Sequence, residues 1–195
     1  MTLEVVGGER LKDCKNTIVF ANHPTYVDVT VLMSLMPEVT CVVKKVPWCH
    51  PFFGIAKGAG YVSNGEPEAL VDDCVAALDR GQSLLLFPEG TRTRPGKPLK
   101  FLRGAAYIVL KSGKPILPVL LHCDPPTMTK GSRWFQIPSR AFHFRVEVLP
   151  PLHVTDLLQD TSSLAPAIAA RRLTEALENY FCLELEKHGK PEARN

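Results

Sequence analysis

Short apolar segments alternate with longer amphipathic ones along most of this chain, and this alternation limits the available folds more than any other feature. The apolar segments favour strands and the amphipathic ones favour helices. The predicted strands span residues 17–21, 39–43, 61–63, 83–87, 116–121 and 142–148. The predicted helices span residues 26–36, 66–80, 104–112 and 166–188. Alternation of this kind predicts an α/β fold with a mixed, mostly parallel sheet covered by helices.

Length and composition narrow the class of protein. The 195 residues fit one domain, residues 1–195, and the sequence has no internal repeat or clear linker. A formal net charge of +3 is too weak to indicate a nucleic-acid-binding protein. The six cysteines form no C-x-x-C pair, so reduced thiols are expected rather than a zinc site. No apolar run reaches the roughly 18 residues that span a bilayer.

The most informative motif is Asn-His-Pro-Thr-Tyr-Val-Asp at residues 22–28. His23 follows a predicted buried strand, and Asp28 lies about one helical turn further on. A carboxylate beside an imidazole fixes its tautomer and stabilises its protonated form, so the pair can take a proton from an attacking alcohol. The alternative is a structural histidine followed by an aspartate at a helix N-terminus.

A second motif, Phe-Pro-Glu-Gly-Thr-Arg, occupies residues 87–92, directly after another predicted strand. It places a carboxylate, a glycine, a hydroxyl and a guanidinium at a strand's carboxyl end, where α/β proteins usually bind ligands. Arg92 can hold an anionic group there through two hydrogen bonds.

These two motifs, in this order, resemble those of the glycerolipid acyltransferase superfamily, which includes lysophosphatidate acyltransferases. A proline-containing block of that family is similar to residues 116–119, and a further block is similar to residues 45–64, with Pro51, Phe53, Gly54 and Gly58 in place. The resemblance extends from about residue 5 to residue 121. It implies a glycerolipid acyltransferase-like fold.

The resemblance implies direct acyl transfer from acyl-CoA or an acyl carrier protein thioester to a hydroxyl of a lysophospholipid or related lipid. His23 is then the general base and Asp28 its orienting partner. The substrate-binding residues implied are Asn22, Asn64, Glu89, Gly90, Thr91, Arg92, Arg103 and Pro118. Backbone amides near Gly90, or at the start of the helix after His23, are candidate donors to an oxyanion. No metal and no cofactor are expected beyond the thioester co-substrate.

Two positions depart from the family pattern. Asn64 stands where phosphate-binding members carry an arginine, so an acceptor phosphate loses one charged partner. The family often carries a lysine directly after the phenylalanine of this block. Here, in the run Phe-Leu-Arg-Gly, the basic residue is Arg103, one position later. Lysophosphatidate is therefore a less secure prediction for the acceptor, and an uncharged or otherwise non-standard lipid fits as well.

The basic run between Arg92 and Arg103 has two interpretations. It contains five basic residues and no acidic one. It is either a solvated loop or a surface for phosphate, a carrier protein's acidic helix or anionic lipid headgroups. Arg92 is expected in the site, and Lys97 and Lys100 on its rim.

Two other functions remain open. A thioesterase could use the same histidine and aspartate with water as acceptor, and a non-catalytic lipid- or carrier-binding module needs neither residue. The acyltransferase prediction carries expectations on location: a cytoplasmic protein in peripheral contact with the inner face of a membrane, with no nucleic-acid partner. The sequence leaves open whether an upstream membrane anchor precedes this chain.

Overall fold

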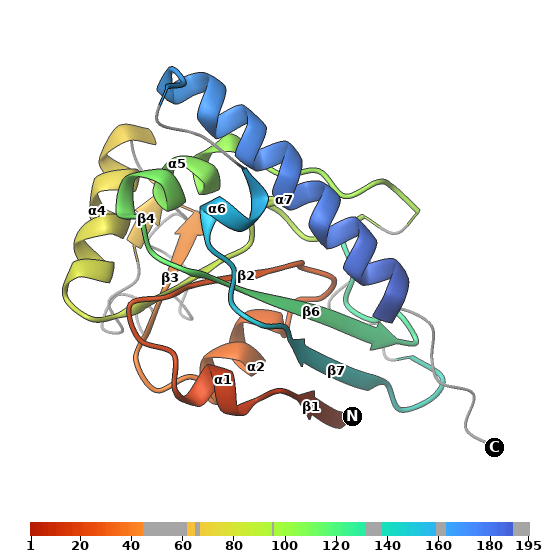
Figure 1. The fold of residues 1–195 in the computed structure, drawn as a ribbon. Helices are drawn as coiled ribbons and strands as arrows, with labels where there is room; N and C mark the ends of the chain where they lie inside the picture. The colour runs from red at the N-terminus through yellow and green to blue at the C-terminus, as the bar shows by residue number, and fades with distance from the viewer. Residues whose placement is uncertain (45–61, 65–66, 95, 132–137, 159–162, 189–195) are drawn as a thin grey trace.

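The computed structural model describes residues 1–44, 62–64, 67–94, 96–131, 138–158 and 163–188 (Figure 1). The strands are β1 (Thr2–Val6), β2 (Ile18–Ala21), β3 (Val39–Lys44), β4 (Val62–Asn64), β5 (Ser83–Leu86), β6 (Ile116–Asp124) and β7 (His143–Val148). The helices are α1 (Glu9–Lys12), α2 (Asp28–Leu35), α4 (Pro67–Asp79), α5 (Arg103–Ser112), α6 (Val154–Leu157) and α7 (Pro166–His188).

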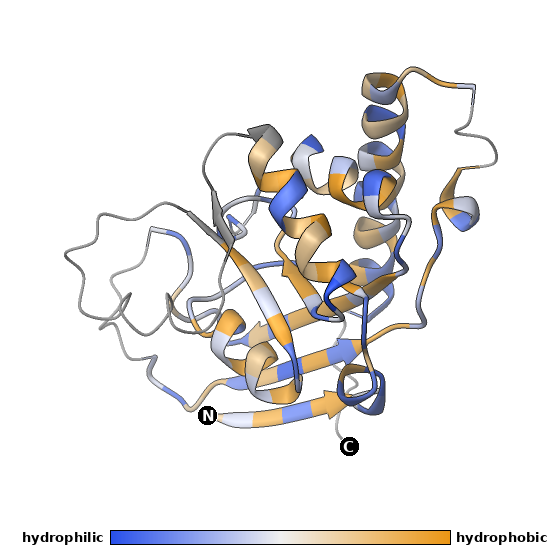
Figure 2. Cartoon of the chain, turned by 90° about the vertical axis from the view of Figure 1, so that its left-hand side faces the viewer, coloured by the Kyte–Doolittle hydropathy of each residue, from blue (hydrophilic) through white to orange (hydrophobic). Residues whose placement is uncertain are grey.

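The strands form one mixed sheet in the order β1-β7-β6-β2-β5-β3-β4. β6 and β7 pair antiparallel, and the other described pairs are parallel. The predicted fold class, a mostly parallel sheet covered by helices, is therefore confirmed. Figure 2 shows hydrophobic and hydrophilic residues alternating along β7, as expected for a strand near the sheet's edge.

Helices cover both faces of the sheet (Figure 1). On one face, α4, α5 and α7 pack on residues such as Phe20 and Leu84, and Phe181 is their largest fully buried contribution. On the other face, α1 and α2 pack through Leu11 and Leu32. Buried side chains from alternate positions of the central strands thus enter two separate cores, which explains why these strands are apolar throughout.

Every predicted strand and helix is present, with shifted ends in most cases. β6 continues to Asp124 because β7 pairs with it as far as His143. α2 begins at Asp28, two residues later than predicted. β1, α1 and α6 were not predicted: each has only four or five residues. Gly113 ends α5 in the left-handed conformation (φ 63°), which glycine adopts without steric cost.

The topology brings the two motifs together. β2 lies between β5 and β6, and the parallel pairing of β2 with β5 places Phe20 opposite Leu86. The chain therefore leaves both strands at the same edge of the sheet, at a point where connections diverge to either side. No helix among the described residues is both long enough and apolar enough to cross a membrane.

Candidate active site

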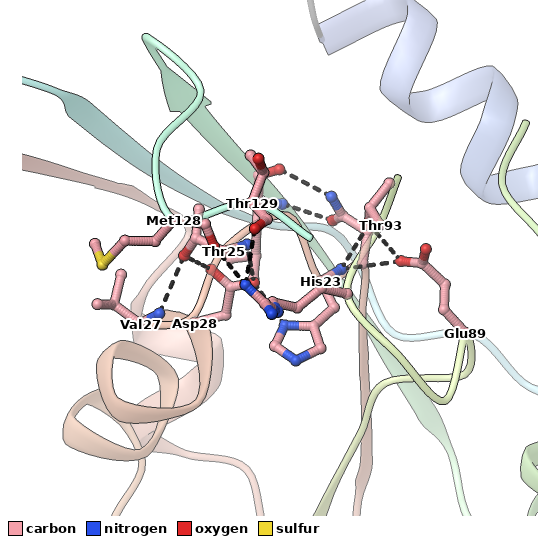
Figure 3. A network of polar contacts seen from close by, with 11 residues as sticks. His23, Thr25, Val27, Asp28, Glu89, Thr93, Met128 and Thr129 are labelled. Carbon is pink, nitrogen blue, oxygen red and sulfur yellow. Dashed lines mark hydrogen bonds and ion pairs between the residues drawn. The ribbon is translucent and has the colours of Figure 1, made fainter. Parts of the chain in front are cut away.

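His23 and Asp28 are in direct contact. His23 lies two residues after β2, and Asp28 is the first residue of α2. His23 Nδ1 is 2.8 Å from Asp28 Oδ2 (Figure 3). Because a carboxylate can only accept hydrogen bonds, the neutral imidazole of His23 carries its proton on Nδ1, and its lone pair is then on Nε2. Nε2 makes no hydrogen bond to any described residue, and 16% of the His23 side chain is accessible.

Asp28 is held by donors from its own turn. Its side chain is fully buried. The backbone N–H of Thr25 donates to Oδ2 at 2.8 Å, and the Thr25 hydroxyl donates to Oδ1. The backbone N–H of Val27 donates to that hydroxyl at 3.2 Å. These donors compensate a buried negative charge and fix the carboxylate's orientation toward His23.

The backbone of His23 is fixed by the second motif (Figure 3). Its N–H lies 3.0 Å from Glu89 Oε1 and 3.2 Å from Thr93 Oγ1. Its carbonyl accepts a hydrogen bond from the Thr93 N–H at 2.7 Å. The Thr93 hydroxyl also donates to Glu89 Oε1 at 2.6 Å. Glu89, predicted to bind substrate, thus uses one oxygen to position the base.

The surroundings of the site are partly apolar. The His23 ring stacks on Phe87, with centroids 4.2 Å apart and an interplanar angle of 28°. Burial raises the pKa of the Glu89 carboxyl above its ordinary value, while the hydrogen bonds from Thr93 and His23 act in the opposite direction. Burial therefore makes the charged form of Glu89 less stable than it would be in water.

Asn22 was predicted to bind substrate, but its side chain forms two hydrogen bonds with the backbone of Leu121 in β6. Its amide nitrogen donates to the Leu121 carbonyl at 2.9 Å, and its amide oxygen accepts from the Leu121 N–H at 2.8 Å. The residue is only 4% exposed. Both polar groups of the amide are thus used to join the end of β2 to β6, next to His23.

Thr91 and Arg92 contact a loop that follows β6. Arg92 Nη1 donates to the carbonyls of Met128 and Thr129, at 2.9 Å each. The guanidinium carbon also lies 4.2 Å from the centre of the Tyr26 ring. Lys130 Nζ donates to Thr91 Oγ1 at 2.7 Å. The predicted binding residues here therefore also anchor the loop beside the site.

Three further predicted residues have different surroundings. Gly90 has a φ of 63°, and a Cβ there would overlap Leu102. Its N–H donates to Phe87 O at 2.9 Å, so this amide is not free to bind an oxyanion. Arg103 is exposed at the start of α5. Pro118 is buried within β6, opposite Phe20, and so lies in the sheet rather than beside the imidazole.

The block predicted at residues 45–64 is mostly outside the described residues, including Pro51, Phe53, Gly54 and Gly58. Asn64 ends β4, where its backbone pairs with Lys44. β4 is separated from β2 by β5 and β3.

Sequence reasoning missed three residues that contact His23 or Asp28, namely Thr25, Phe87 and Thr93. It also missed Lys130, which contacts Thr91 of the second motif. Thr25 had a local signal, because a threonine three residues before an aspartate can donate to that carboxylate within one turn. Thr93 and Lys130 had none, because their partners lie 70 and 39 residues away.

The arrangement can perform general-base chemistry. A buried carboxylate orients a histidine whose second nitrogen is unbonded among the described residues. A hydroxyl that approaches Nε2 can transfer its proton there as its oxygen attacks a carbonyl carbon. No group of side chains that could hold a metal ion occurs among the described residues.

Sequence comparisons identify similar proteins. A family model described as Acyltransferase matches residues 2–122. A protein from Limnanthes douglasii named 1-acyl-sn-glycerol-3-phosphate acyltransferase is 30% identical over 167 residues, which cover 81% of this chain and 57% of that protein. The protein from Mus musculus named 1-acyl-sn-glycerol-3-phosphate acyltransferase alpha is 26% identical over 182 residues. The match covers 88% of this chain and 62% of the mouse protein. The chain thus spans only about 60% of these relatives.

A solved structure shares the fold. The crystal structure of the 1-acyl-sn-glycerophosphate (LPA) acyltransferase PlsC from Thermotoga maritima superposes with a TM-score of 0.70. The match covers 99% of this chain and 73% of that one, at 22% sequence identity. At this identity the likeness concerns the fold, including the helices after residue 122 that the family model does not reach.

Proposed function

The chain belongs to the acyltransferase family, and on that basis we propose that it transfers a fatty-acyl group from a thioester to a hydroxyl of a 1-acylglycerol-3-phosphate, with His23 as general base. The donor is acyl-CoA or an acyl carrier protein thioester. The observation that supports this mechanism best is the contact between His23 Nδ1 and Asp28 Oδ2, with Nε2 unbonded among the described residues.

In the proposed reaction, the acceptor hydroxyl gives its proton to His23 Nε2 as its oxygen bonds to the thioester carbonyl carbon. Asp28 stabilises the imidazolium that forms. The tetrahedral intermediate then collapses, the carbon–sulfur bond breaks, and the leaving thiolate takes the proton from Nε2. The products are an ester and a free thiol, so protons and bonds balance without any further reactant.

The relatives are named as enzymes that act on 1-acyl-sn-glycerol-3-phosphate, and this favours a phosphorylated acceptor. Arg92 supplies a positive charge directly before Thr93 in the chain, and Thr93 contacts the backbone of His23. Arg92 forms no ion pair with any described carboxylate. Asn64 favours an uncharged acceptor instead, because its side chain carries no positive charge to attract a phosphate. The acceptor assay below includes an uncharged lipid for this reason.

The test is an assay of free-thiol release and lipid ester formation by the purified protein, with acyl-CoA and acyl carrier protein donors. Acceptors are 1-acylglycerol-3-phosphate, glycerol-3-phosphate and monoacylglycerol. We expect His23→Ala to lower kcat about 10²- to 10⁴-fold, the usual contribution of general-base catalysis. His153→Ala is the matched control, because His153 is exposed at the start of α6 and should leave the rate unchanged.

Two results would contradict this function. Thiol release without any acceptor, undiminished when acceptors are added and with no ester formed, would identify a thioesterase. Transfer by His23→Ala at the wild-type rate would remove the histidine from the mechanism and favour a binding module or another base.

A further inference from the structure

The last turn of α7 lies beside β6 and β7, where several titratable side chains meet outside the candidate active site (Figure 1). His188, at the end of α7, points one ring nitrogen at each of two carboxylates. Its Nδ1 lies 2.8 Å from Glu147 Oε1 in β7. Its Nε2 lies 3.3 Å from Glu184 Oε2, one turn earlier in α7. The imidazole therefore bridges the end of the helix and the sheet.

This bridge needs the protonated form of His188. An imidazolium donates from both nitrogens, whereas a neutral imidazole donates from one and carries a lone pair on the other. While both carboxylates are ionised, a neutral ring would turn that lone pair toward a carboxylate oxygen at close range, and the two would repel each other. Both contacts are therefore favourable only while the ring is charged.

The bridge is partly shielded from solvent. Glu147 is only 6% exposed, and Arg145 Nη2 lies 3.4 Å from its Oε2. Glu184 also pairs with the exposed Lys187 at 2.6 Å. Because a partly buried ion pair is screened less than a pair in open solvent, the charge on His188 strengthens its contact with Glu147. The His188 side chain is itself 32% accessible, so its proton can exchange with water.

A second histidine of this cluster favours the neutral form. His122 lies opposite Arg145 in the pairing of β6 with β7, and its buried Nε2 forms no hydrogen bond with a described residue. Burial lowers the pKa of His122 below its ordinary value of 6.5. The charge of Glu147 acts in the opposite direction, while those of Arg145 and His188 add to the effect. Below pH 6.5 the folded protein therefore binds fewer protons at His122 than the unfolded chain, and stability falls with acidification.

We propose that His188 is a pH-sensitive latch for the last turn of α7, closed on Glu147 while the ring is charged and released as rising pH removes a proton. On the acid side, protonation of His122 limits the closed state, because it adds a like charge next to Arg145 and His188. The latch does not depend on acyl transfer. It concerns how firmly the end of α7 is held on the sheet.

Hydrogen exchange of α7, followed by mass spectrometry at a series of pH values, tests this. Rates are corrected for the intrinsic effect of pH on exchange. We expect the protection of residues 185–188 to fall about tenfold between about pH 6 and about pH 8.5, as when one hydrogen bond to a charged group is lost. Residues 169–177, which carry the buried face of α7, should not show this fall.

Two variants separate the charge of the ring from its shape. His188→Arg carries a permanent charge, so the last turn should stay protected across the whole pH series. His188→Gln carries no charge, so it should show the lower protection at every pH. His153→Gln is the matched control, because His153 is an exposed histidine at the start of α6. It should keep the pH dependence of the wild-type protein.

Protection that falls with pH in the wild-type protein but not in His188→Arg would support the latch. If the wild-type protein protects its last turn equally at both ends of the pH series, His188 does not act as a latch. The same conclusion follows if His188→Gln keeps the wild-type pH dependence. None of these results involves enzymatic turnover, so the proposed function stands or fails separately.

Discussion

At the scale of single residues, the candidate base depends on two threonines with different tasks. Thr25 donates to both carboxylate oxygens of Asp28. Thr93 holds the backbone of His23 at both its N–H and its carbonyl. An imidazole must be held within a fraction of an ångström to meet a hydroxyl productively, so such anchors affect rate more than binding.

Thr93 is therefore expected to be a positioning residue. Thr93→Val keeps the side chain's shape but removes the hydroxyl that accepts from the His23 N–H and donates to Glu89. We expect kcat to fall about tenfold or more, with little change in the KM for either substrate, because the base is displaced while the substrate contacts remain. Steady-state kinetics with the phosphorylated acceptor measures this.

Thr93→Ser serves as the rescue variant, because it restores the hydroxyl and should recover most of the wild-type kcat. Thermal unfolding of both variants separates positioning from folding. Equal kcat values for Thr93→Val and the wild-type protein would show that Glu89 alone is enough to hold His23.

At the scale of elements, α7 supports the site although it lies far from it in sequence (Figure 1). Its buried residues recur every three or four positions along one face, from Ala169 to Phe181. Phe181 meets Phe101 edge to face, with centroids 5.4 Å apart, and Glu178 accepts a hydrogen bond from the Phe101 N–H at 2.7 Å. The next residue, Leu102, donates to Pro88 O in the second motif.

Phe181→Ala should strongly destabilise the protein, because it removes a fully buried ring from the contact between α7 and the sheet. The expected loss in free energy of unfolding is about 3–5 kcal/mol. Urea unfolding followed by circular dichroism measures it. Leu183→Ala is the control on the same helix: its side chain is 56% exposed, so a change of about 0.5 kcal/mol or less is expected.

At the scale of the whole molecule, stability and the charge of the site are coupled through Glu89. Burial raises the pKa of this carboxyl above its ordinary value of 4.5. Between the pKa of the unfolded chain and that of the folded protein, the folded protein binds more protons. The free energy of unfolding contributed by this group is therefore greatest below pH 4.5 and falls as pH rises through the folded-state pKa.

Glu89→Gln removes this titration while keeping an oxygen that can accept from His23 N–H and Thr93. We expect the variant to gain stability relative to the wild-type protein as pH rises above 4.5. Urea unfolding of both proteins at a series of pH values measures the difference. A difference that stays constant with pH would mean that Glu89 has the same pKa in the folded and unfolded states.

The elements and the identity of the central pair were predictable from the sequence, because both depend on residues close together in the chain. The periodic apolar face of α7, the apolar run of β2 and the terminal glycine of α5 are local patterns. So is the spacing of His23 and Asp28, which form their contact within one turn.

The tertiary structure alone decided which side chains surround that pair. Asn22 bonds to Leu121, 99 residues away, and Lys130 reaches Thr91 across 39 residues. Likewise, β1 forms a strand because β7 pairs with it, with Thr2 opposite His143. No local pattern records such contacts, because hydrogen bonds between distant segments depend on the order and register of the strands that bring them together.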